Sequence, residues 1–135
     1  MLRRVLKNRT VCCSLLTALG LSLSASAHHS HAMFDDAKRI AIVGTVMDFE
    51  YTNPHSWLKV INDADGSLWS FETNPPSTLL RAGVKRSSLP SGEKVTVNAM
   101  PLRDGRPGGQ IVNVVKTDGT TIIMAPQGYS GGPTK

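Results

Sequence analysis

The chain has 135 residues, of which 40% are hydrophobic and 19% charged, and its formal net charge is +5. This length fits one small domain rather than several. The charge is unevenly spread, because Arg3, Arg4, Lys7 and Arg9 precede the first acidic residue by a wide margin. The basic excess therefore belongs mainly to the N-terminus, and it gives no argument for binding nucleic acid or an anionic membrane.

Residues 1–27 have the three features of a secretory signal peptide. The basic start is followed by an apolar stretch, VCCSLLTALGLSLSA, and then by the small-residue pattern Ala25-Ser26-Ala27. The apolar stretch is shorter than the roughly 20 residues that a membrane span needs, and serines interrupt it. We therefore expect cleavage after Ala27, a periplasmic or secreted protein, and no stable membrane span after cleavage.

Cleavage would leave 108 residues with a formal charge of +1, because four of the fifteen basic residues and none of the ten acids lie in 1–27. Cys12 and Cys13 would also be removed, which excludes disulfide and thiolate chemistry from the mature domain. The chain has no Gly-x-Ser-x-Gly, no His-Glu-x-x-His, no phosphate loop and no dinucleotide fingerprint. We expect a protein that is not an enzyme.

The mature chain predicts a series of short strands interrupted by one short helix. Segment 40–51 is long enough for a strand that bends. Its first residues are apolar on both faces of the expected strand, and Gly44 is a candidate bending point. Before the helix, Asn74 is a candidate cap, and Gly83 is a candidate terminator. The expected strands are 40–51, 56–63, 67–73, 94–100 and 110–117, with a short apolar run at 120–124 and the helix at 77–82.

This order of elements predicts an all-β, OB-like fold. The OB-fold is a five-stranded Greek-key barrel, and its helix lies between the third and fourth strands. We expect a five- to six-stranded antiparallel barrel over 40–124, after a histidine-bearing arm at 28–39 and before a flexible tail at 125–135. Another small antiparallel barrel or sandwich with an incidental helix is the alternative.

Two loops of the expected barrel carry most of its distinctive chemistry. The loops after the first and fourth strands of an OB barrel frame its ligand-binding face. In this chain they are 51–57, which contains His55, and 101–109, which contains two arginines. Each has a plainer interpretation, as a turn, a solvated loop or aromatic core packing. The candidate residues for binding a ligand or partner are Tyr51, Asn53, Trp57, Arg103, Asp104 and Arg106.

Three of the four histidines lie directly after the expected cleavage point. Cleavage after Ala27 would make His28 the first residue, so that its α-amine and imidazole form a chelating pair. Imidazole suits Cu, Zn and Ni, and Cu(II) has the highest affinity among the divalent ions of the first transition series. We therefore treat His28, His29, His31 and His55 as candidate metal ligands, with copper as the candidate cofactor. A solvated tip without a role is the alternative for the N-terminal three.

Five segments of the chain together resemble a known family of small exported bacterial proteins. The resemblance extends over residues 27–124, and the segments that carry it are AHHSHAMFD, TNPHSWLKV, WSFET, LPSGEKVTV and PLRDGRPGG. The family is catalogued only as a domain of unknown function. Its usual pattern continues the first block as His-His-Ser-Phe, and His31 replaces that aromatic residue here. The positions that the family blocks single out are His28, His29, Asn53, Pro54, His55, Trp57, Arg103, Asp104 and Gly105.

The resemblance implies a periplasmic, non-enzymatic β protein and names no ligand. Two functions therefore remain open: a metal-binding module that uses the histidines, and an interaction module whose two loops contact a partner protein or a small anion. Oligonucleotide binding is disfavoured by export and by the near-neutral charge of the mature chain.

Overall fold

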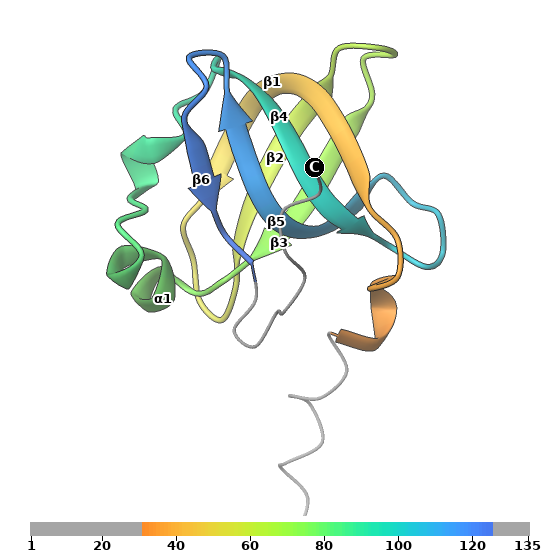
Figure 1. Cartoon of the computed structure of the whole chain (residues 1–135), viewed down its shortest axis with the longest axis horizontal. Helices are drawn as coiled ribbons and strands as arrows, with labels where there is room; N and C mark the ends of the chain where they lie inside the picture. The colour runs from red at the N-terminus through yellow and green to blue at the C-terminus, as the bar shows by residue number, and fades with distance from the viewer. Residues whose placement is uncertain (1–30, 126–135) are drawn as a thin grey trace, which may run out of the picture. The chain divides into compact units, whose positions relative to one another are not determined.

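The strands of this chain close into a barrel, as the computed structural model shows for residues 31–125 (Figure 1). The prediction of an OB-like barrel with one short helix between its third and fourth strands is confirmed. The elements are η1 (His31–Met33), β1 (Ile40–Glu50), β2 (Ser56–Asn62), β3 (Leu68–Thr73), α1 (Pro76–Arg81), η2 (Arg86–Ser88), β4 (Lys94–Pro101), β5 (Gly108–Lys116) and β6 (Thr121–Ile123). η1 and η2 are single 3₁₀ turns.

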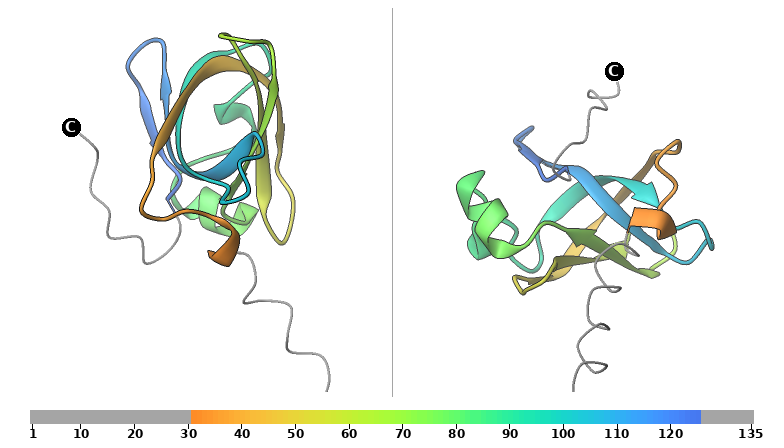
Figure 2. Two further views of the ribbon diagram at one scale, coloured as in Figure 1. Left: turned by 90° about the vertical axis from the view of Figure 1, so that its right-hand side faces the viewer. Right: turned by 90° about the horizontal axis from the view of Figure 1, so that it is seen from below.

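The sheet runs in the order β3-β2-β1-β4-β5-β6, and an additional pairing between β3 and β5 closes it. Every neighbouring pair is antiparallel except this one, which is parallel. The barrel is therefore mixed rather than wholly antiparallel, and β6 is an extra strand that pairs only with β5. Figure 2 shows the barrel strands curling into a ring.

β1 is long enough to serve both halves of the barrel, because it pairs with β2 and with β4. Gly44 lies where β2 approaches most closely, and a Cβ there would come within 2.6 Å of Cγ1 of Val60 and would also meet the carbonyl oxygen of Ile61. The irregularity in the β1–β2 register comes later, between Val46 and Asp48. Glycine is thus required for close approach, and the bulge supplies the bend.

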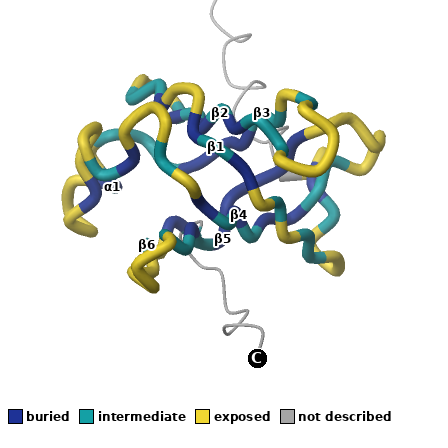
Figure 3. The backbone as a smooth tube through the Cα atoms, turned by 90° about the horizontal axis from the view of Figure 1, so that it is seen from above, coloured by how far each residue is buried: buried dark blue, intermediate teal, exposed yellow. Residues whose placement is uncertain are grey.

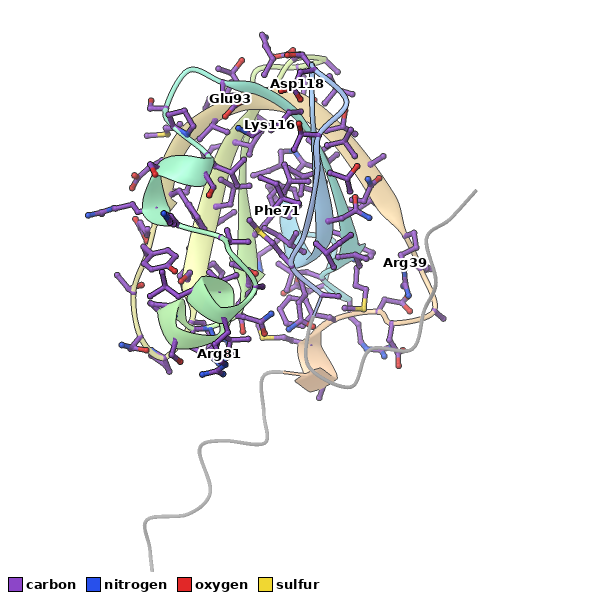
Figure 4. All side chains as sticks on the ribbon, turned by 60° about the vertical axis from the view of Figure 1, so that its left-hand side comes forward. Arg39, Phe71, Arg81, Glu93, Lys116 and Asp118 are labelled. Atoms are coloured by element: carbon purple, nitrogen blue, oxygen red, sulfur yellow. The ribbon has the colours of Figure 1, made fainter. Side chains whose placement is uncertain are left out.

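The barrel interior is filled by the inward-facing residues of all five strands. Phe71 is fully buried at its centre (Figure 4), and Trp69 stacks on it with ring centroids 5.8 Å apart. Leu79 of α1 joins the same core. Figure 3 shows buried backbone along the strands and exposed backbone in the hairpins. Trp57 differs from the other aromatic residues, because it alternates with buried Ser56 and Leu58 and lies on the outer face.

The helix begins without the cap that the sequence predicts. Pro75 is the N-cap residue and no side chain caps the helix. The amide nitrogen Nδ2 of Asn74 instead donates to the carbonyl oxygens of Met124 and Ala125, at 3.3 and 3.0 Å. Asn74 therefore ties the start of the helix to the end of β6, which is a tertiary contact that a local pattern does not reveal.

The arm before β1 packs against the barrel. Phe34 is 3% exposed and forms a second small core with Met100 and Val112. Phe34 also forms a β-bridge with Leu102, and the backbone N–H of Asp35 donates to Pro101 O at 2.8 Å. The described part of the arm is thus anchored beside the β4–β5 loop.

Candidate functional site

Three side chains form a row across the outer face of β2, β3 and β5. Trp57 pairs with Glu72, and Glu72 pairs with Gln110 across the parallel closure. Directly paired residues project from the same side of a sheet. Glu72 is only 4% exposed and Gln110 6%, so both polar residues are buried on the face that OB barrels use for binding.

Both buried residues in this row have an oxygen without a hydrogen-bond donor. Oε1 of Glu72 and Oε1 of Gln110 are inaccessible and make no hydrogen bond within the described part of the chain. Buried polar atoms without partners are uncommon and costly, and they frequently mark a functional site. Oε1 of Gln110 can therefore accept a further hydrogen bond, whereas Oε1 of Glu72 already faces the ring of His55.

His55 contacts this row from the β1–β2 loop. Its ring nitrogen Nδ1 lies against Oε1 of Glu72 in ion-pair contact, without the alignment of a hydrogen bond. The His55 side chain is 36% exposed whereas that of Glu72 is 5% exposed. A carboxylate at Nδ1 leaves Nε2 as the nitrogen available to a ligand, which is how proteins commonly orient a metal-binding histidine.

The loop that carries His55 is held at several points. The hydroxyl group of Thr52 donates to His55 O at 3.1 Å, and the backbone N–H of Ser56 donates to Asn74 O at 3.3 Å. The Tyr51 hydroxyl group lies 3.0 Å from Pro76 O and 2.9 Å from Val84 O. Desolvation by burial raises the pKa of Tyr51 above its ordinary value. These contacts tie the His55 loop to β3 and the helix.

The arginines of the β4–β5 loop already have acidic partners. Arg103 donates to Ala32 O at 3.2 Å and lies 3.4 Å from Asp36 Oδ1. Arg106 pairs with Asp104 at 2.8 Å. The backbone N–H of Arg106, followed by its side chain, lowers the pKa of the Asp104 carboxyl group. The loop is therefore close to charge-neutral, which weakens it as a site for capturing a small anion.

The two candidate loops lie at different ends of the barrel. Seen from below, the β1–β2 loop is beside α1, and the β4–β5 loop is beside η1 (Figure 2). Asn53 and Pro54 are exposed at the first loop and are joined by a cis peptide bond. His31 lies in η1, whereas His28 and His29 lie outside the described residues. The structure thus brings His55 to Glu72 and does not bring the two loops together.

Residues 31–125 contain no cluster of three or more His, Cys, Asp or Glu side chains arranged to hold a metal ion. His55 and Glu72 supply two such groups, and Gln110 adds a neutral oxygen on the next strand. No helix in residues 31–125 is long and apolar enough to cross a membrane.

Sequence patterns missed Glu72 and Gln110. Glu72 was discoverable, because the Asp65-Gly66 turn sets the hairpin register that places it opposite Trp57. Gln110 depends on the β3–β5 closure, which joins distant segments and has no local signature.

Fold and site together define a small OB-like barrel with a buried polar row on the face that corresponds to the binding face of OB barrels. The chain belongs to a family of unknown function, DUF6152, whose model matches residues 17–112. Searches of the curated proteins and of the solved structures found no significant match.

Proposed function

We propose that this protein is an exported, non-catalytic binding protein that holds a transition-metal ion, with copper as the first ion to test. His55 would be a ligand through Nε2. His28, with its α-amine after cleavage at Ala27, and His29 would form the second group of ligands.

The contact between His55 and Glu72 carries this proposal. A metal-binding imidazole is typically oriented by a carboxylate at its other nitrogen, and that outer partner raises the basicity of the ligand. Glu72 has this position, and its side chain is almost fully buried in β3, so the carboxylate is held in place against Nδ1. Imidazole ligands suit Cu, Zn and Ni.

The competing function is an interaction module that binds a periplasmic partner or a small anion through Tyr51, Trp57, Arg103 and Arg106. The ion pairs of the two arginines argue against anion capture. Trp57 remains available on the outer face, so the partner version is the one to compare with metal binding.

Copper titration of the processed protein tests the proposal. Cu(II) would be added in competition with a chelator of known affinity, to the wild type, to His55→Ala, and to a chain with one extra residue before His28. We expect both changes to weaken binding by about tenfold or more. The stoichiometry shows whether the two groups of ligands share one ion. Equal affinity of all three proteins would contradict the proposal.

The interaction module gives the opposite pattern. Trp57→Ala would then abolish binding of a partner while leaving copper affinity unchanged. A loss of copper binding in His55→Ala counts only if this variant is folded. The dispersion of its amide NMR spectrum checks the fold.

A further inference from the structure

A groove separates the helical connection from β6, on a part of the molecule remote from the β4–β5 loop. Its volume is about 460 Å³. The apolar part of its lining comes from Leu79 and Val84 on one side and from Ile122, Ile123 and Ala125 on the other. Figure 1 shows β6 between β5 and the α1–η2 connection, so the groove runs alongside an outer strand of the sheet.

Among the strands of residues 31–125, β6 pairs on one side only, and its other backbone edge faces this groove. The N–H of Met124 donates to Val112 O, and the carbonyl oxygen of Thr120 accepts from Lys116. In an antiparallel pair, alternate residues bond to the same neighbour, so Thr121 and Ile123 direct their N–H and C=O groups away from β5. An exposed edge of this kind is a template for another strand.

Ile123 strengthens the interpretation of this edge as a binding surface. Its side chain is 60% exposed, although edge strands usually carry charge or proline to prevent pairing. β6 carries neither, since its sequence is TII. The edge is short, but neither charge nor proline protects it, and it lies next to apolar walls.

The segment that forms the helical wall of the groove carries only positive charges, on residues that border the groove without lining it. Arg81, Lys85 and Arg86 are exposed, and none of them forms an ion pair within residues 31–125. Segment 74–92 contains no acidic residue. The Arg81 side chain points outward from the end of α1 (Figure 4). These three cations are sequence neighbours of the lining residues 82–84, so they border the groove and favour an acidic occupant.

We propose that this groove binds an extended, acidic segment of a partner protein, which adds a strand to the free edge of β6. Its backbone would pair with Thr121 and Ile123, while alternate apolar side chains enter the groove. Its acidic side chains would lie near Arg81, Lys85 and Arg86. This surface is independent of His55 and of the metal proposal.

Charge argues against two other occupants of the groove, namely a second copy of the chain and the chain's own C-terminal residues. A second copy of the chain, paired edge to edge through β6, would bring the same cations toward each other. Residues 126–135 begin directly after the groove residue Ala125, but they contain no acid and Lys135 is their one charged side chain. Neither supplies the negative charge that the wall requires.

Synthetic peptides test this proposal with the processed protein. The first probe is a seven-residue peptide of alternating glutamate and valine, and the second replaces each glutamate with lysine. A third has the glutamate sequence but is N-methylated on alternate amides, which removes the donors that a strand needs. Binding would be measured by fluorescence anisotropy and located by amide chemical shifts.

Matched charge variants complete the test. Lys85→Glu with Arg86→Glu reverses the charge beside the groove, and Lys38→Glu with Arg39→Glu makes the same change in an adjacent Lys-Arg pair before β1. We expect the glutamate peptide alone to bind, with shifts at Val84, Thr121 and Ile123. The wall variant should weaken it by about tenfold and the control variant by less than about twofold.

Four results would overturn the proposal: equal binding of the lysine peptide, binding of the N-methylated peptide, shifts confined to other surfaces, or equal loss in both variants. Sedimentation as a dimer through β6 would assign the edge to a second copy. A shortened chain without residues 126–135 gives a further comparison. If this deletion shifts the groove amides, and adding the peptide to the shortened chain shifts them back, the groove belongs to the chain's own C-terminus.

Discussion

Nδ1 of His55 lies against Oε1 of Glu72, although the first residue is in an exposed loop and the second is buried in β3. The loop position gives the ring access to solvent, and the strand position fixes the charge that the ring faces. A partly exposed imidazole is thereby held with one nitrogen toward the barrel and the other available.

Glu72→Gln keeps the shape of this side chain and removes its charge. We expect metal affinity to fall by about 10- to 100-fold, because the orienting carboxylate is lost while His55 remains. Chelator-competition titration measures the change. Glu50→Gln is the matched control, since the Glu50 carboxylate is on the same sheet and forms its ion pair with Lys59 rather than with His55. If both variants lost affinity equally, a general charge effect would replace the specific one.

Gly44→Ala tests the close approach of β1 to β2. The added Cβ would come within 2.6 Å of Cγ1 of Val60 and would meet backbone of Ile61, which cannot move aside. We expect the free energy of unfolding in urea to fall by about 3 kcal/mol. Gly66→Ala is the control, because nothing lies near its Cβ and only its positive φ of 72° is strained. It should cost about 1 kcal/mol. Equal costs would show that space at Gly44 is not limiting.

Phe34→Ala tests whether the arm is anchored by its own small core. Phe34 is 3% exposed against Met100 and Val112, so its removal should cost about 3 kcal/mol locally. Hydrogen exchange at the Asp35 amide, which donates to Pro101 O, should then accelerate strongly. Met33→Ala, at a residue that is 41% exposed, should leave this exchange rate unchanged. Unaltered protection in the Phe34 variant would mean that the backbone bonds suffice.

Tyr51→Phe tests the link between the His55 loop and the helix. Its hydroxyl group bonds to Pro76 O and Val84 O, so the variant should lose about 1–2 kcal/mol at neutral pH. Burial raises the pKa of Tyr51 above 10.0, and the folded state therefore holds the phenolic proton more tightly than the unfolded state. The contribution of the Tyr51 hydroxyl group to the free energy of unfolding is complete below pH 10, and it is lost as pH rises through the folded-state pKa.

Urea unfolding at pH 7 and at several values above pH 10 measures this dependence. The difference in unfolding free energy between wild type and Tyr51→Phe should shrink with rising pH. A difference that stays constant would mean that the hydroxyl group is not desolvated in the folded protein.

Local patterns predicted the barrel well, because its strands and turns have local causes. Asp65-Gly66 marks the β2–β3 hairpin, and Gly66 has the positive φ that such a turn requires. The helix lies within one residue of its expected range at each end. Alternation in β2 and β3 also separates inward residues from outward ones.

The part of the site that sequence patterns did not predict depends on how the barrel closes. The parallel pairing of β3 with β5 brings Gln110 next to Glu72, and no pattern within either strand contains that information. The placement of the two loops at different ends of the barrel and the acidic partners of Arg103 also depend on contacts between segments that are distant in the sequence. The expected copper ligands His28 and His29 lie outside the described residues, so they remain predictions from sequence.

The ¹⁵N NMR spectrum of the His55 ring, recorded before and after one equivalent of diamagnetic Zn(II), shows most directly whether Nε2 binds a metal ion. We expect a metal-free ring protonated at Nδ1, toward Glu72, and a large shift of Nε2 when zinc binds. If zinc binds the protein while Nε2 of His55 keeps its shift, His55 is not a ligand and the proposed site is wrong.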